Sequence, residues 1–304
     1  MAFVQQLQDT VRAVGERVGP SVVRIGRGWG RGNGVVIGEG FVLTNAHNLR
    51  GRETTVTFAD GRTATGAVAG ADLEGDLAVL RVDTGDAPAI SWEPATTVEA
   101  NSVVFAVALT GDGGRRVTFG TVTATGREFR GPRGWRITGS VEHTVPLGRG
   151  SSGNPVVDSD DRFLGLNTKR LGDGFYLALP ADDSLKTRVD ALVRGESPAR
   201  LRLGVGLAPA RAARAMRRAV GLPERDGLLV RVVEDDSPAD GAGLRQGDLL
   251  VEAGGRALAT ADDLHSVLEG LSTDDTLALK VVRGTDDLDV RVSFVAAARS
   301  EGSA

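Results

Sequence analysis

Three short stretches of this 304-residue chain carry side chains that could together transfer an acyl group to water. Phe41-Val-Leu-Thr-Asn-Ala-His47 places a histidine directly after an apolar run, and Asp76 stands at the start of another such run. Gly150-Ser-Ser-Gly-Asn-Pro155 places a serine in a glycine-flanked turn. Acyl transfer needs a nucleophile, a base that takes its proton and an acid that holds the base in the correct tautomer. The pattern therefore predicts a catalytic triad of His47, Asp76 and Ser152.

Each of these stretches is common by itself, and only their combination is informative. A histidine at a strand end is usually an ordinary surface or core residue, and an aspartate before an apolar run usually belongs to a turn. The chain order His, Asp, Ser is the order found in chymotrypsin. Glycines beside the serine also let backbone N–H groups face a developing oxyanion. The expected donors of this oxyanion hole are Gly150, Ser151 and Ser152.

Short β-type runs separated by turn residues fill the region from Ser21 to about Pro180. Regular strands with glycine-rich turns indicate a sandwich or barrel, and about 160 residues of them exceed one small barrel and suit two. Helical spacing of apolar residues predicts a helix over residues 1–18, and a closing helix is expected over Asp182–Leu192. The predicted strands are Ser21–Ile25, Gly34–Ile37, Phe41–Thr44, Thr54–Phe58, Leu77–Val82, Ser102–Ala108, Val117–Thr125, Trp135–Thr138, Pro155–Val157, Phe163–Asn167 and Phe175–Leu179.

A second unit follows a segment of linker composition at residues 194–200, so the first unit is expected to cover residues 19–193. The second unit extends over residues 201–296 and mixes strands with helices. Residues 297–304 are small and polar, and we expect a disordered tail there. The predicted strands are Leu203–Leu207, Gly227–Val233, Leu249–Ala253, Thr276–Arg283 and Asp287–Phe294, and the predicted helices are Pro209–Val220 and Thr260–Leu271.

The composition excludes several classes of site and partner. The chain has no cysteine, and its three histidines are scattered, so we expect no disulfide, no metal and no cofactor. The net charge of −4 provides no general attraction to nucleic acid or to an anionic membrane. No apolar stretch is long enough to span a bilayer, and residues 1–15 do not resemble a signal peptide. As written, the sequence predicts a cytoplasmic protein, or an extracytoplasmic one if an export signal is missing.

These residues together resemble the HtrA (Deg) family of trypsin-like serine proteases. Leu43-Thr-Asn-Ala-His47 matches the family's Leu-Thr-Asn-x-His string, and Asp76–Leu80 matches its Asp-Leu-Ala-Val-Leu string. Gly150–Pro155 approximates its Gly-Asn-Ser-Gly-Gly-Pro loop and aligns Ser152 with the nucleophile. The resemblance implies a mostly β fold, a chymotrypsin-like double β-barrel followed by an α+β PDZ domain. Gly165-Leu-Asn-Thr168 resembles the strand that pairs with substrate, and the expected substrate strand is Leu166, Asn167 and Thr168.

Two residues of the nucleophile loop depart from the family pattern. Ser151 replaces Asn, and Asn154 replaces the second Gly. The side chain of Ser151 should matter little because the oxyanion donors are backbone N–H groups, and Asn tolerates a left-handed backbone better than most residues. Ser151 is an alternative nucleophile, but the family register and Gly153 favour Ser152. The departures leave a catalytically inactive peptide-binding or chaperone-like homologue as the alternative function.

The resemblance also predicts which side chain the specificity pocket takes. A trypsin-type pocket for Arg or Lys needs an acidic floor. The family alignment places that floor near Pro146, and the nearest acid upstream is Glu142. We therefore expect a pocket for a small or medium apolar side chain. The remaining histidines, His143 and His265, lie outside the matching motifs.

In the second unit, Arg202-Leu-Gly-Val205 resembles the carboxylate-binding loop of bacterial PDZ domains. Ser237–Leu244 and Gln246–Leu250 resemble their Ser-Pro-Ala…Ala-Gly-Leu…Gly-Asp string. Backbone N–H groups of such a loop form a nest for a C-terminal carboxylate, and the following strand accepts the peptide as an extra strand. The helix over Thr260–Leu271 would form the other wall. The expected groove residues are Arg202, Leu203, Gly204, Val205, Leu207, Leu264, Val267 and Leu268.

The resemblance implies an ATP-independent serine endopeptidase that acts on unfolded or damaged proteins. Ser152 would attack, His47 would act as base and then as acid, and Asp76 would orient His47. The expected partners are unfolded polypeptides and apolar peptide C-termini bound by the PDZ domain, with no nucleic acid and no membrane span. Family members are often trimers joined through N-terminal aromatic residues, and Phe3 is the one available here for a homotrimer.

Overall fold

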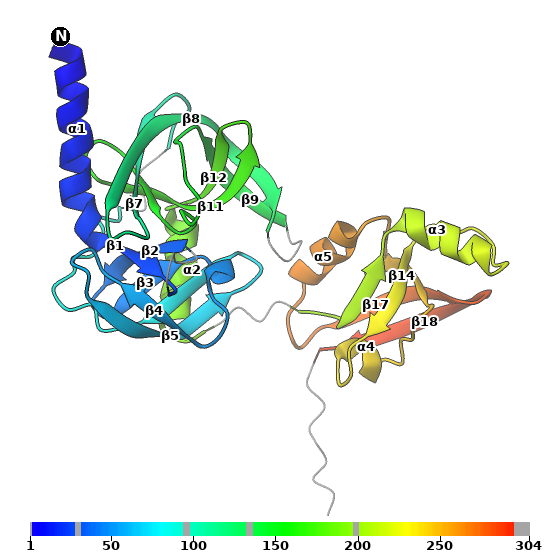
Figure 1. The fold of residues 1–304 in the computed structure, drawn as a ribbon. Coiled ribbons are helices and arrows are strands. Elements are labelled where there is room, and N and C mark those ends of the chain that lie inside the picture. Colours follow the sequence, from blue (N-terminus) through cyan, green and yellow to red (C-terminus); the bar gives the residue numbers. More distant parts are fainter. Residues whose placement is uncertain (1, 28–31, 94–97, 132–135, 197–200, 295–304) are drawn as a thin grey trace, which may run out of the picture. The chain divides into compact units, whose positions relative to one another are not determined.

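The computed structural model describes residues 2–27, 32–93, 98–131, 136–196 and 201–294 (Figure 1). The chain divides into two compact units, Met1–Pro198 and Ala199–Ala304. Strands predominate in the described part of the chain, so the predicted mostly β fold class is confirmed. The expectations for Trp135, for most of the linker and for the tail at residues 297–304 lie outside the described residues.

Six antiparallel strands close the first barrel in the order β1-β2-β3-β6-β5-β4. β-Branched and other apolar side chains such as Val23, Val42 and Leu80 fill it, because such side chains pack well on a pleated surface. The neighbouring strands β3 and β6 pair with Thr44 opposite Ala78. The strands are β1 Val22–Ile25, β2 Gly32–Gly38, β3 Phe41–Thr44, β4 Glu53–Thr57, β5 Thr63–Asp72 and β6 Leu77–Arg81.

Six further antiparallel strands close the second barrel in the order β10-β11-β12-β9-β8-β7. One continuous core joins the two barrels, since Leu43 and Leu77 of the first belong to the same buried cluster as Phe105 and Leu166 of the second. Full burial of each such side chain contributes roughly 1.5–3 kcal/mol. The strands are β7 Val103–Leu109, β8 Arg115–Arg130, β9 Arg136–His143, β10 Pro155–Val157, β11 Phe163–Gly172 and β12 Phe175–Pro180.

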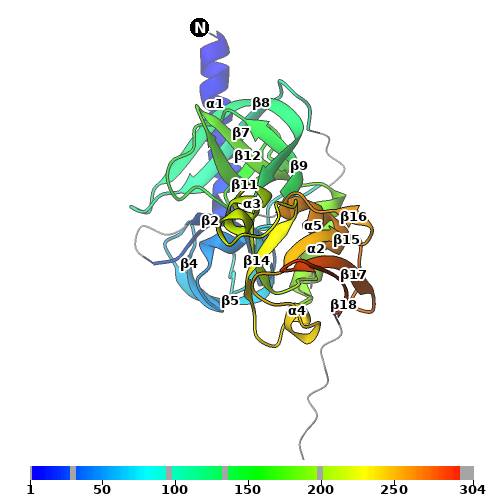
Figure 2. The same cartoon turned by 90° about the vertical axis from the view of Figure 1, so that its right-hand side faces the viewer.

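Two helices flank the barrels. α1 (Ala2–Val18) buries Val14 and Val18 near its C-terminal end, and its N-terminal end projects beyond the barrels in both views (Figures 1 and 2). Pro20 lies in the 3₁₀ turn η1 (Gly19–Ser21) that follows the helix. α2 (Asp183–Val193) begins at Asp182, whose side chain accepts a hydrogen bond from the N–H of Leu185. None of the helices among the described residues has the length and apolarity that a bilayer-spanning helix requires.

The second unit is a sheet in the order β13-β14-β15-β17-β18 with helices beside it, and β16 pairs with β15. β13 is an edge strand. α5 begins with a capping box, in which Thr260 and Asp263 satisfy each other's backbone N–H groups. The elements are β13 Val205–Ala208, α3 Ala210–Ala219, β14 Leu228–Val233, α4 Pro238–Gly241, β15 Leu249–Ala253, β16 Arg256–Ala257, α5 Ala261–Glu269, β17 Thr276–Arg283 and β18 Asp286–Ser293.

Three elements of the fold were not predicted from the sequence. β5 reads Thr-Ala-Thr-Gly-Ala-Val-Ala-Gly-Ala-Asp, which has little hydrophobicity of its own and forms a strand because it pairs with β4 on one side and β6 on the other. α4 and β16 have four and two residues, and both are too short to produce a periodic pattern.

Candidate active site

His47 and Asp76 meet because the strands beside them are neighbours in the first barrel. β3 ends at Thr44, and the 3₁₀ turn η2 (Ala46–Asn48) then presents His47. Asp76 directly precedes β6 and adopts a left-handed backbone with a φ of 56°. The Nδ1 atom of His47 lies 2.9 Å from Oδ1 and 2.8 Å from Oδ2 of Asp76. Sequence positions 29 residues apart are thereby joined in one hydrogen-bonded pair.

Three residues restrain the buried Asp76 in addition to the imidazole ring of His47. Thr168 Oγ1 donates to Oδ2 at 2.6 Å, and the backbone N–H of His47 donates to Oδ1 at 3.1 Å. Asn45 Nδ2 donates to the backbone carbonyl of Asp76 at 3.1 Å. An ionised carboxylate accepts hydrogen bonds only, so Nδ1 of a neutral His47 carries the proton and Nε2 keeps its lone pair. This is the tautomer that a general base requires.

The turn before Asp76 has its own support, which the sequence did not indicate. The N–H of Gly75 donates to Oδ1 of Asp72 at 2.8 Å. Arg188, on α2, donates to Oδ2 of the same carboxylate at 2.6 Å. Asp72 is buried, so this ion pair connects the helix firmly to the turn that carries Asp76.

The turn that carries Ser152 is shaped by two glycines and held by two asparagines. Gly150 and Gly153 have φ values of 78° and 86°, and a Cβ on Gly153 would lie 2.1 Å from the carbonyl oxygen of Asn33. Asn33 Nδ2 donates to the carbonyl of Gly150 at 2.8 Å, and its backbone N–H donates to the carbonyl of Ser152 at 2.7 Å. Asn48 Nδ2 donates to that same carbonyl at 3.1 Å.

The hydroxyl of Ser152 faces β11. Its Oγ donates to the carbonyl oxygen of Thr168 at 3.4 Å, and within the described residues no hydrogen bond joins it to His47. The backbone N–H groups of Gly150, Ser151 and Ser152 have no acceptor among the described residues, so they are available to a negatively charged oxygen.

A pocket of about 190 Å³ opens beside Ser152 in the second barrel. The expected substrate strand, Leu166 to Thr168, only partly coincides with the segment that lines this pocket. Leu166 is fully buried and packs in the shared core opposite Pro155, so it is corrected from a substrate residue to a core residue. The segment that lines the pocket is Asn167–Arg170. The described residues that line the pocket are Leu147, Gly148, Arg149, Gly150, Ser151, Ser152, Asn167, Thr168, Lys169, Arg170 and Tyr176.

None of the described residues that line this pocket is acidic. Glu142 is buried elsewhere, where Thr123 Oγ1 donates to it at 2.7 Å and Arg127 Nε donates to it at 3.0 Å. Pro146 is exposed and is not part of the lining.

His143 is not a residue of the expected triad, but hydrogen bonds through Asn167 connect it to the turn that carries Ser152. It is fully buried, its ring stacks on Tyr176, and its Nε2 lies 2.7 Å from Oδ1 of Asn167. Desolvation lowers the pKa of His143 from 6.5 to about 4, so it is neutral near pH 7. Asn167 Nδ2 in turn donates to Oδ1 of Asn154 at 2.7 Å. Sequence motifs could not indicate this network, because its members come from three separate strands or turns.

In the second unit the residues expected to form the groove divide into two sets. Leu203, Leu264 and Leu268 are core residues, which corrects the expectation that Leu264 and Leu268 line a pocket. The burial of Leu264 and Leu268 follows from their spacing on one face of α5, which packs on the sheet. Val205, Leu207 and Val267 are only half-buried and remain available to a ligand.

The loop before β13 has the features of a carboxylate nest. Gly204 has a φ of 77°, and its carbonyl accepts from the N–H of Glu234 at 2.8 Å. The N–H groups of Leu203 and Gly204 have no acceptor within the described residues. Arg202 is exposed and pairs with Glu234 at 3.8 Å. The part of the chain that the structure describes contains no group of three or more His, Cys, Asp or Glu side chains suited to a metal ion.

Comparison with known proteins identifies both units. Residues 32–166 match the trypsin-like peptidase domain, and residues 202–294 match the PDZ domain. The chain is 29% identical over 269 residues to the "Probable periplasmic serine endoprotease DegP-like" of Halomonas elongata, covering 86% of this chain and 56% of that relative. It is 26% identical over 294 residues to the "Serine protease Do-like HtrA" of Lactobacillus helveticus, covering 88% of this chain and 68% of the relative. The chain thus spans little more than half the length of the DegP-like relatives.

Solved structures show the same fold. The "HtrA-type protease AlgW with decapeptide" superposes with a TM-score of 0.66 at 21% identity, covering 93% of this chain and 97% of that one. The serine endoprotease from Yersinia pestis superposes with a TM-score of 0.65 at 23% identity, covering 93% and 96%. The resemblance read from the sequence motifs is confirmed by both units and by these relatives: the chain has a trypsin-like peptidase domain followed by a PDZ domain, as an HtrA family protease has.

Proposed function

We propose that this chain is an ATP-independent serine endopeptidase that cleaves unfolded or damaged polypeptides. The observation that carries the proposal is the pair formed by Nδ1 of His47 and the buried carboxylate of Asp76, with Ser152 in a glycine turn that shares Thr168 with that carboxylate. The names of the DegP-like and HtrA relatives support the same activity.

The geometry supports a mechanism in which Ser152 Oγ attacks the scissile carbonyl. The 3.4 Å bond from Oγ to Thr168 is long, so little free energy is lost when Oγ gives it up for a bond to His47. His47 takes the proton and later gives it to the leaving amine, while Asp76 stabilises the imidazolium. The unpaired N–H groups of Gly150 and Ser152 receive the oxyanion.

Labelling with a fluorophosphonate, followed by mass mapping of the modified serine, tests this proposal directly. We expect a single label on Ser152, loss of the label and of casein hydrolysis in Ser152→Ala, and retention of both in Ser151→Ala. A label on Ser151 would show that the register is wrong. An unlabelled wild-type chain would support the inactive homologue instead.

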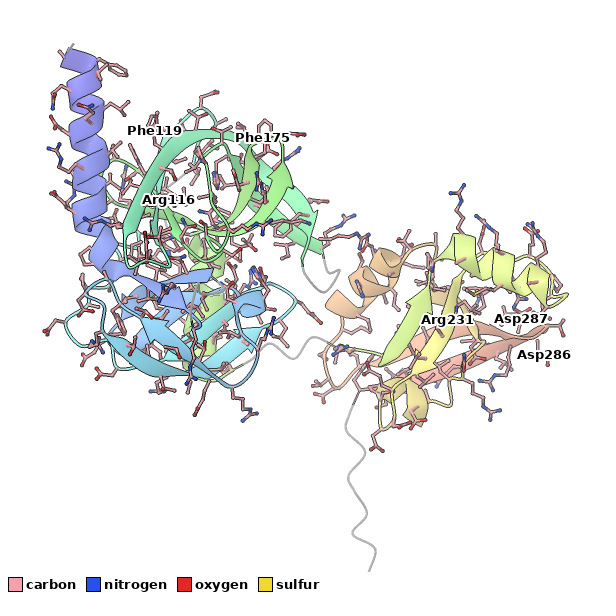
Figure 3. The ribbon with its side chains drawn as sticks, viewed as in Figure 1. Arg116, Phe119, Phe175, Arg231, Asp286 and Asp287 are labelled. Carbon is pink, nitrogen blue, oxygen red and sulfur yellow. The ribbon has the colours of Figure 1, made fainter. Side chains whose placement is uncertain are left out.

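The pocket supports a preference for small or medium apolar side chains, since no acid lines it. Its rim is basic, because Arg149 and Arg170 line it and the guanidinium of Arg116 lies against Gly148. Figure 3 labels Arg116 on β8. Arg116 also interacts electrostatically with Asp112, and the guanidinium of Arg170 lies 5.7 Å from the centre of the Tyr176 ring. Peptides with an Asp beside the apolar residue should therefore be cleaved roughly two- to fivefold faster than Asn peptides, as for an exposed charge pair, and Arg170→Gln should reduce that ratio.

The second unit is proposed to bind apolar peptide C-termini in extended form along β13. Support comes from the unpaired N–H groups of Leu203 and Gly204, the open edge of β13 and the half-buried Val205 and Leu207. A Val-ending peptide should bind the full chain at about micromolar Kd, and its C-terminal amide should bind markedly more weakly because the N–H groups lose a charged acceptor. Equal affinity for acid and amide would contradict this assignment.

We further propose that the chain works in the compartment of its DegP-like relatives, whose names place them in the periplasm. Cell fractionation of the native host tests this location.

A further inference from the structure

A chain of three buried, hydrogen-bonded side chains connects β9 to the turn that carries Ser152. Nε2 of His143 lies 2.7 Å from Oδ1 of Asn167, and Nδ2 of Asn167 donates to Oδ1 of Asn154 at 2.7 Å. All three residues are fully or almost fully excluded from solvent. We propose that this relay positions the nucleophile turn, so that Asn154 takes a role that the family's second glycine cannot have. The inference rests on the proposed peptidase function.

The direction of the hydrogen bonds follows from the backbone end of the relay. The N–H of Val145 donates to Nδ1 of His143 at 3.2 Å, so Nδ1 is unprotonated and Nε2 carries the proton of the neutral ring. Nε2 therefore donates to Oδ1 of Asn167, and only Nδ2 of Asn167 is left to donate to Asn154. Turning either amide over would place two donors or two acceptors face to face. The relay has a single consistent orientation.

This orientation explains a buried polar atom without a partner. Nδ2 of Asn154 makes no hydrogen bond with any described residue, although it is buried. A buried unpaired donor is destabilising, and a glycine at position 154 would avoid that cost. The relay explains why the chain tolerates this unpaired Nδ2: the same side chain provides Oδ1, which accepts the hydrogen bond from Asn167.

Backbone conformation provides no separate reason for the residue at position 154. The left-handed residues of the loop are Gly150 and Gly153, whereas Asn154 does not have a positive φ. The expectation that Asn is accepted here for its tolerance of left-handed backbone is therefore wrong. What distinguishes Asn from Gly at this position is the side-chain bond to Asn167.

Asn167 connects the relay to the reacting groups through its backbone and through the residue that follows it. Its carbonyl accepts from the N–H of Gly153 at 2.7 Å, and its N–H donates to the carbonyl of Asn154 at 3.0 Å. The next residue, Thr168, contacts both Oγ of Ser152 and the carboxylate of Asp76. A displaced Asn167 would move the nucleophile and the triad acid together.

Asn154→Gly is the sharpest kinetic test, because it restores the family's residue and removes the relay bond together with the unpaired Nδ2 of Asn154. We expect kcat on a peptide substrate to fall about tenfold or more while KM stays within about twofold, because a turn out of place slows the acylation step rather than binding. His143→Gln, which can still accept from Val145 and donate to Asn167, should retain more activity than His143→Ala. Ser140→Ala, which truncates another buried side chain of β9, is the matched control and should leave kcat unchanged.

Nitrogen-15 NMR of the His143 ring provides a readout that does not depend on activity. We expect the neutral Nε2–H tautomer at pH 6, and a changed Nε2 resonance in Asn154→Ala although residue 154 does not touch the ring. An Nδ1–H tautomer, or wild-type kcat in Asn154→Gly, would overturn the relay. An inactive, unlabelled wild-type chain would instead count against the peptidase function, and the NMR result would still decide the relay.

Discussion

At the scale of single residues, Asp76 shows how one buried carboxylate selects the reactive form of another side chain. Its two oxygens receive hydrogen bonds from the ring and the backbone of His47 and from Thr168, so they act only as acceptors. This arrangement leaves Nε2 of His47 as the basic atom. The chemistry of the candidate site thus requires a side chain at position 76 that accepts hydrogen bonds and donates none.

Asp76→Asn should therefore lower kcat by about 10⁴-fold with little change in fold. The Asn amide would donate toward Nδ1, so the proton would move to Nε2 and the imidazole could no longer accept the proton of Ser152. Kinetics on casein or a peptide measure the loss, and circular dichroism reports the fold. Asp173→Asn, at another aspartate with positive φ, is the control and should keep wild-type kcat.

His143 should make the stability of the first unit sensitive to acid. The groups that contact it are the ring of Tyr176, the amide of Asn167 and the N–H of Val145, and none of them carries a charge. Its folded pKa of about 4 lies below the usual 6.5, so the unfolded chain binds the proton more readily. This group therefore contributes its full stability above about pH 6.5, and the contribution falls as the pH drops toward 4.

Because of His143, the free energy of unfolding is expected to be about 2 kcal/mol lower at pH 5 than at pH 8. Urea unfolding measures the free energy of unfolding of the first unit at pH 5 and at pH 8. Between these two pH values, His143→Gln should lose about 2 kcal/mol less of this free energy than the wild type. An identical pH dependence in the two proteins would contradict the buried, neutral state of His143.

At the scale of elements, helix α2 supports the turn between β5 and β6. Arg188 is the charged partner of the buried Asp72, whose other oxygen binds the N–H of Gly75, one residue before Asp76. A helix at the end of the first unit thus restrains a residue of the candidate triad. The restraint is tertiary, since its partners are 116 residues apart.

Arg188→Ala should destabilise the chain by about 2 kcal/mol, because it leaves a buried carboxylate without its charged donor. We also expect a severalfold fall in kcat with KM nearly unchanged, and partial recovery of both in Arg188→Lys. Arg194→Ala, which removes an exposed ion pair with Glu196, is the matched control and should change stability by less than about 1 kcal/mol. Equal effects of the two substitutions would contradict the supporting role of Arg188.

At the scale of the whole molecule, α1 presents an apolar end that its own unit does not cover. Phe3 and Val4 are 75% and 58% exposed, whereas Val14 and Val18 of the same helix are buried. The family resemblance implies a homotrimer joined through N-terminal aromatic residues, and the exposed Phe3 is the side chain available for such a contact.

Light scattering should report about three times the chain mass of 31.6 kDa for the wild type and a smaller particle for Phe3→Ser. The physical reason is the loss of the aromatic surface from the contact. Gln8→Ser, on the same helix but polar, is the control and should leave the mass unchanged. A monomeric wild type would contradict the trimer.

The sequence by itself determined the side chains of the candidate triad, the glycine turn and the mostly β class, because these depend on residue type and on short-range patterns. His47, Asp76 and Gly150–Pro155 could be found without a structure, since their chemistry requires those residues in local motifs. Helix α5, predicted over Thr260–Leu271 and observed over Ala261–Glu269, was readable for the same reason.

Only the tertiary structure decided which of these residues face a ligand and which face the core. The pairing of β10 with β11 buries Leu166 and leaves Asn167–Arg170 at the pocket, and packing on the sheet buries Leu264 and Leu268. The relay through His143, Asn167 and Asn154 could not be predicted from the sequence either. Each of these outcomes depends on partners far apart in the chain, and local sequence patterns carry no information about such partners.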